Sequence, residues 1–241
     1  MVIAIVALLI SLLLPVLRSA REIAIQTQCL AQIRSIAMAT AVYQVDHNGY
    51  YPHAYKNLPG IPGNYTQALN SYLGLSPANQ NATTNNFDGW HCPATDEGRA
   101  VWAEAGIYGH NPNLMPFWNP TDPSVTYAPY FAPEYPNQYI RDDMFPDMPP
   151  SKLAMFIDCK RPTWWNPPNT PNMATTPTDY IFPHLSSEPI TWTAAAYREP
   201  ATNGTAGVAF TDGHAAAHYA ADFNTWTVGS GQPRIYSFTV Q

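Results

Sequence analysis

The most continuous hydrophobic pattern lies at the start of the chain. Residues 1–17 read MVIAIVALLISLLLPVL and contain no charged side chain. As a helix, this run would span roughly 26 Å at ~1.5 Å per residue, which approaches the ~30 Å hydrocarbon core of a bilayer. A secretory signal peptide would place basic residues before the run, and a buried core helix is seldom apolar on every face. We therefore expect a membrane helix, with those two interpretations as alternatives.

Beyond this run the pattern becomes that of a helix with one apolar face. Between residues 25 and 43, apolar side chains recur at every third or fourth position, namely Ile25, Cys29, Ile33, Ile36, Ala39 and Tyr43. This spacing places them on one face of a helix. The pattern predicts that the second part of the helix packs against a folded body, whereas the first part does not.

The two patterns join into one predicted helix from Met1 to about His47. Asn48 and Gly49 suit a left-handed cap at its C-terminal end, and Pro52 cannot continue it. Pro15 should loosen the helix, because proline removes a backbone donor and crowds the carbonyl four residues earlier.

The remainder of the chain shows short apolar runs separated by Pro, Asn and Gly, a pattern typical of strands joined by long loops. A proline-rich irregular excursion is expected at 116–150. The other predicted elements are a short helix at 64–75, strands at 153–158 and 191–197, and a hairpin from 207 to 218 with Asp212-Gly213 as a two-residue turn.

These elements predict an α+β fold in which a long N-terminal α-helix packs on a loop-rich antiparallel β-sheet body. The predicted organisation is a helix at 1–49 and a body at 50–241. Within the helix, 1–17 is the membrane or filament-core segment and 18–49 is the amphipathic half.

Composition narrows the possible functions. The net charge is -6, which argues against a nucleic-acid partner, since phosphate binding needs clustered Lys and Arg. Charged residues make up only 12% of the chain, and hydrophobic residues 46%. The sequence contains no GxSxG, HExxH or phosphate-binding glycine loop, so we expect no enzymatic activity and no cofactor.

The segments IAIVALLISLLLPVLRSARE and CLAQIRSIAMATAVYQVDHNGYYP resemble the N-terminal region of type IV pilin-like proteins and type II secretion pseudopilins. The chain is most similar to the bacterial prepilin-type group that carries a C-terminal His-X9-Asp-Gly element. Trp90–Pro93, Tyr108–Asn111 and Phe210–His214 resemble further short segments of that group. Thr202 stands where the group has the His of this element.

The resemblance implies a structural subunit of an extracellular or periplasmic filament, either a type IV pilus or a type II secretion pseudopilus. Its partners would be copies of itself and, before assembly, the inner membrane of a bacterial cell envelope. Val6, Leu9, Leu13 and Pro15 would lie in the membrane and then in the filament core. Alignment on the family proline places Met1 several residues into the mature family sequence, so the leader and the family glutamate are expected upstream.

Two other functions compete with a filament subunit. One is a membrane-anchored or filament-tip binding module, an adhesin or a cargo-contacting minor pseudopilin, with residues 116–150 as its contact surface. The other is a secreted hydrolase with an unfamiliar site. Deletion of residues 116–150 would separate the filament subunit from the binding module, and activity assays of the body on broad substrate panels would test the hydrolase.

Candidate metal ligands are few. Asp46 opens a fragment of a calcium-loop pattern, although a helix cap explains that segment as well. Asp212 lies near His214 and His218, but a turn and a strand explain those residues too. The resemblance to major pseudopilins, which bind calcium in a C-terminal loop, keeps calcium possible. In the Phe210–His214 segment, we expect Asp212, Gly213 and His214 to form the turn.

The three cysteines suggest one covalent link. If the body lies outside the cytoplasm, Cys92 and Cys159 could form a disulfide. Cys29 falls on the apolar face of the predicted helix, where we expect a small core residue.

Overall fold

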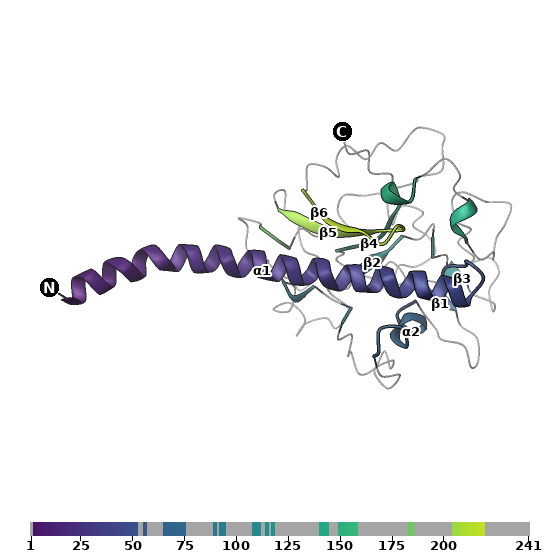
Figure 1. Cartoon of the computed structure of the whole chain (residues 1–241), viewed down its shortest axis with the longest axis horizontal. Helices are drawn as coiled ribbons and strands as arrows, with labels where there is room; N and C mark the ends of the chain where they lie inside the picture. The colour runs from purple at the N-terminus through teal and green to yellow at the C-terminus, as the bar shows by residue number, and fades with distance from the viewer. Residues whose placement is uncertain are drawn as a thin grey trace, which may run out of the picture.

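The computed structural model describes part of the chain, namely residues 2–52, 55–56, 65–75, 89–90, 92–94, 108–111, 114–115, 117–118, 140–144, 149–158, 183–185 and 204–219. Within these residues the protein has the predicted α+β architecture, a long N-terminal helix packed on an antiparallel sheet (Figure 1). Several predicted features lie outside the described residues, namely the strand at 191–197, Cys159, Thr202 and most of the proline-rich excursion at 116–150.

Helix α1 runs from Val2 to Asp46 without interruption, and its 45 residues include Pro15. It ends as predicted: Asn48 and Gly49 have φ values of 55° and 84°, and the Gly49 amide donates to the Gln44 carbonyl at 2.7 Å. These are the features of a left-handed C-terminal cap.

A four-stranded antiparallel sheet forms the centre of the described body. Its strand order is β2 (Tyr108–His110), β4 (Ala154–Asp158), β5 (Thr205–Phe210) and β6 (Ala215–Tyr219). The predicted strand at 153–158 is thus confirmed as β4. Strand β5 pairs on both edges, with β4 and β6, and every one of its residues is buried.

Smaller elements surround this sheet. Helix α2 occupies Tyr65–Asn70, within the helix predicted at 64–75, and is followed by a turn. Strands β1 (Tyr55–Lys56) and β3 (Phe117–Trp118) form a separate parallel pair. Two 3-10 turns, η4 (Asp142–Met144) and η5 (Pro150–Lys152), precede β4.

The hairpin of β5 and β6 lies where the sequence predicts it, but its turn is of another type. The Gly213 amide donates to the Phe210 carbonyl, and the Phe210 amide donates to the His214 carbonyl, both at 2.9 Å. The loop therefore has three residues, Thr211 to Gly213, and among them only Gly213 has positive φ. This pattern is a type I turn followed by a bulge, so the prediction of a two-residue Asp-Gly turn was wrong.

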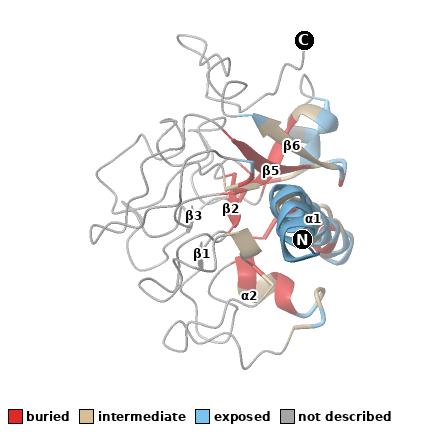
Figure 2. Cartoon of the chain, turned by 90° about the vertical axis from the view of Figure 1, so that its left-hand side faces the viewer, coloured by how far each residue is buried: buried red, intermediate tan, exposed pale blue. Residues whose placement is uncertain are grey.

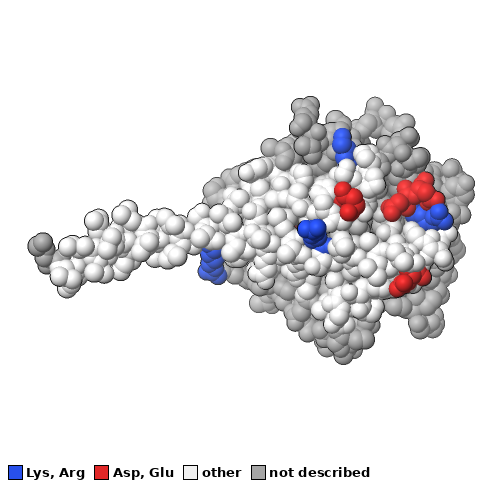
Figure 3. Space-filling model, in the orientation of Figure 1, with Lys and Arg blue, Asp and Glu red and all other residues white. Residues whose placement is uncertain are grey.

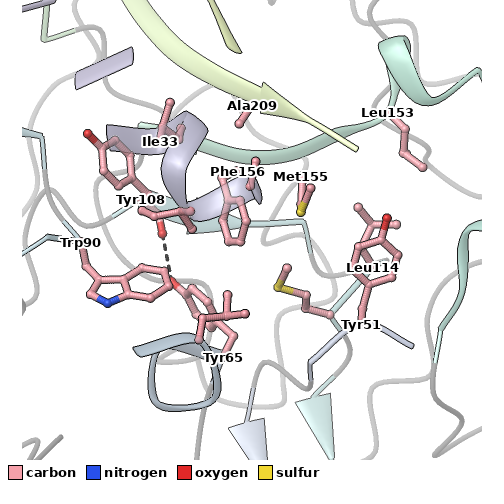
Figure 4. Packing of buried hydrophobic residues seen from close by; sticks show 14 of the residues in the cluster. Ile33, Tyr51, Tyr65, Trp90, Tyr108, Leu114, Leu153, Met155, Phe156 and Ala209 are labelled. Atoms are coloured by element: carbon pink, nitrogen blue, oxygen red, sulfur yellow. Dashed lines mark hydrogen bonds between the residues drawn. The ribbon is translucent and has the colours of Figure 1, made fainter. Parts of the chain in front are cut away.

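The core lies between α1, the sheet and α2 (Figure 2). Gly207 lets α1 approach β5 closely: a Cβ there would lie 3.5 Å from a methyl group of Leu30 and 3.3 Å from Asp158 Oδ2. Aromatic residues fill the space towards α2, where Tyr65 donates a hydrogen bond from its hydroxyl to the Tyr108 carbonyl at 2.9 Å (Figure 4). Trp90 packs edge-on against Tyr65.

Candidate functional site

The first candidate site is the N-terminal end of α1, which projects from the body. It is uncharged along its length (Figure 3). All four predicted filament-core residues are exposed: Val6, Leu9 and Leu13 at 47%, 55% and 56%, and Pro15 as well. The most apolar 18-residue window of α1 has a mean hydropathy of 2.5, and none of it is buried inside the chain. By length and composition α1 is able to cross a membrane.

The one side-chain hydroxyl of this segment is satisfied within the helix. Ser11 Oγ donates to the Leu8 carbonyl at 2.7 Å, so its hydroxyl needs no water. The helix also continues through Pro15, as tolerated in apolar surroundings when other groups compensate. Arg18 is the first charged side chain, and it pairs with Glu22 at 3.3 Å. The polar boundary thus begins immediately after the apolar run.

The candidate metal ligands Asp46 and Asp212 have protein partners instead. Asp46 accepts a hydrogen bond from the Tyr72 hydroxyl at 3.0 Å. Desolvation and, after it, this hydrogen bond raise the pKa of Tyr72. Asp212 Oδ1 accepts a hydrogen bond from the His214 amide at 3.0 Å and also contacts His214 Nδ1. Neither carboxylate belongs to a cluster of three or more possible metal ligands among the described residues.

The Asp212-Gly213-His214 segment builds the hairpin end. The His214 ring stacks on Phe210 with a centroid distance of 4.2 Å, and Gly213 faces Met38 of α1. The Tyr108–Asn111 segment has a similar role, since the Asn111 side-chain amide donates to the Ala154 carbonyl at 2.8 Å. Both segments therefore act in packing.

The cysteine pairing differs from the prediction. Cys29 of α1 forms a disulfide with Cys92, so the predicted Cys92–Cys159 bridge was wrong. Cys29 is buried on the face of α1 that packs on the body, as expected, and the segment after Trp90 lies against that face. The bond links two segments 63 residues apart in sequence and fastens the long helix to the body.

A buried polar cluster surrounds this disulfide. His184 Nε2 lies 3.2 Å from Cys92 Sγ and 3.6 Å from Asp158 Oδ2. The Gly207 amide donates to Asp158 Oδ2 at 2.7 Å. The cluster residues are at most 3% exposed. Sequence reasoning missed His184 and Asp158, because no short motif connects residues brought together from four separate segments.

Comparison of the chain with family models, curated proteins and solved structures gives no match. The resemblance to pilin-like proteins therefore stays a prediction from the quoted segments.

Proposed function

We propose that the chain is a structural subunit of a pilin-like filament of a bacterial cell envelope, a type IV pilus or a type II secretion pseudopilus. The observation that carries the proposal is the projecting half of α1, whose apolar side chains are exposed and not buried against the described part of the chain. Exposed apolar surface of this extent indicates contact with lipid or with other proteins.

The same surface serves two environments in this proposal. Before assembly it lies in the membrane, where a helix satisfies its own backbone hydrogen bonds. In the filament it packs against the helices of neighbouring copies, in head-to-tail contacts that do not close into a ring. Ala4, Ala7 and Ser11 recur at spacings of three and four residues and permit close helix approach.

Replacing Val6 with Lys tests the proposal. Lysine at the centre of a membrane helix costs about 3 kcal/mol on insertion scales, and it places a charge in the packed filament core. We expect the variant to form no filaments while the body keeps its disulfide, measured by electron microscopy of sheared surface fractions and by thiol alkylation. Val6→Leu is the matched control and should assemble normally. Normal filaments from Val6→Lys would contradict the proposal.

A second measurement separates a filament subunit from a membrane-anchored binding module, the alternative. Mass spectrometry of the native N-terminal peptide should find an N-methylated residue after removal of a leader. An unprocessed helix in a protein that stays in the membrane and forms no filaments would favour the anchored module. A chain that begins near Arg21 would mean that the apolar run is a cleaved signal.

A further inference from the structure

We propose that Cys29, Cys92, His184 and Asp158 form a zinc site in the reduced protein, and that the Cys29–Cys92 disulfide is the oxidised, metal-free state of the same site. Sγ of Cys29, Sγ of Cys92 and a ring nitrogen of His184 all lie within 4.8 Å of one another. Two thiolates and one imidazole are ligand types that zinc prefers. This inference does not depend on the filament function.

Asp158 lies beside these three ligands but outside the group whose ligand atoms are all within 4.8 Å of one another, so its carboxylate would have to move towards the two sulfur atoms to complete the ligand set. Its Oδ2 atom lies 3.6 Å from His184 Nε2, close to the edge of roughly 3.3–3.5 Å that separates nitrogen and oxygen ligands in a tetrahedral zinc site. Its Oδ1 atom is buried and has no hydrogen-bond partner within the described part of the chain. A buried carboxylate oxygen without a donor is costly, whereas a bound cation would compensate it.

The surroundings resemble those of a structural metal site. The four side chains come from α1, from the segment after Trp90, from β4 and from the bridge between His184 and Thr205. All four are buried, so solvent does not compete for a bound ion. The Gly207 amide already orients the Asp158 carboxylate, as outer hydrogen bonds commonly do for metal ligands.

The two states interconvert by a balanced reaction. A dithiol reductant supplies two electrons and two protons, which convert the disulfide into two thiols while the dithiol itself becomes a disulfide. Zinc then replaces both thiol protons and forms two zinc–thiolate bonds. In the reverse direction a disulfide oxidant accepts two electrons from the two thiolates, the S–S bond forms, and the ion leaves.

The experiment uses the full chain in detergent, and reduction is carried out in denaturant because the disulfide is buried in the folded protein. The chain is unfolded in denaturant with a dithiol and refolded anaerobically with Zn²⁺ or Co²⁺. We expect one tightly held ion per chain, with Co²⁺ showing thiolate charge-transfer bands and visible bands of a tetrahedral site. Chain refolded with the disulfide intact should bind none.

Variants identify the ligands. Cys92→Ser should abolish the thiolate signal of a two-cysteine site. His184→Asn and Asp158→Asn should each weaken affinity by at least the roughly 10- to 100-fold that loss of an outer hydrogen-bond partner costs. Cys159→Ser and His214→Asn are matched controls and should bind like the unaltered chain. If His184→Asn binds the metal as tightly as the unaltered chain, the ion is held by cysteines of an unfolded chain and not by the proposed site. That result would overturn the proposal. So would a reduced chain that binds no ion, or that stays unfolded by circular dichroism in zinc.

Discussion

The two halves of α1 share one continuous helix but have opposite surroundings. The apolar side chains of the first half, up to Leu17, are exposed on all sides. In the second half one face is buried against the body. The buried residues of this face are Cys29, Ile33, Ile36, Ala37, Ala39, Thr40 and Gln44. The two halves therefore differ in how apolar residues are distributed around the helix, and not in being helical.

The comparison shows how sequence pattern selects the partner of a helix. An apolar stripe needs only a sheet on one side, and the chain supplies it as β4, β5 and β6. A helix apolar all round needs an apolar environment all round, which a sheet on one side cannot provide. The second half is also fastened by polar contacts, such as Gln26 Nε2 donating to Thr205 Oγ1 at 2.7 Å.

The largest effect on the packed half should come from removing its covalent link. A double Cys29→Ala, Cys92→Ala variant should lower the free energy of unfolding by about 4 kcal/mol, because a closed loop of this size restricts the unfolded chain. Denaturant titration of the full chain in detergent with a metal chelator measures the loss. Membrane partitioning of the first half should not change. Cys159→Ser is the control, and a loss below about 1 kcal/mol would show that packing alone holds the helix.

A smaller effect should come from a matched pair of truncations on the same helix. Ile33→Ala removes a fully buried side chain and should lower the free energy of unfolding by about 3 kcal/mol. Leu9→Ala deletes a side chain of similar size in the projecting half and should leave that free energy within about 0.5 kcal/mol of the original. Equal losses for the two variants would contradict the division of α1 into two environments.

The sequence predicted most of what is local. Asn48 and Gly49 marked the end of α1, the spacing of apolar residues by three and four placed its packed face, and a short apolar run placed β4. These signals depend on neighbours along the chain. The turn type was missed at Asp212, whose φ depends on the hydrogen bonds of the surrounding hairpin. The partner of Cys92 was missed as well, since pairing depends on which segment tertiary packing brings against Cys29. The same limit applies to the approach of His184 to Asp158.

The smallest predicted effect is a pH dependence of stability that the body should show and the projecting half of α1 should not. His110 of β2 is buried, and burial lowers its pKa to about 3 from 6.5. Below about pH 6.5 the unfolded chain takes up a proton that the folded chain refuses, so this contribution to stability falls with falling pH, by about 1.4 kcal/mol per unit until about pH 3.

Between pH 7 and pH 5 the folded body should therefore lose about 2 kcal/mol through His110, a loss measured by denaturant titration at both values. His110→Gln should remove this part of the pH dependence, and an unchanged slope in that variant would assign the dependence to other groups. Residues 2–17 contain no titratable side chain, so membrane partitioning of the projecting half should stay constant over the same range. Acid would then loosen the body while leaving the membrane affinity of the apolar helix unchanged, and this outcome requires that the two halves of α1 are held by different forces.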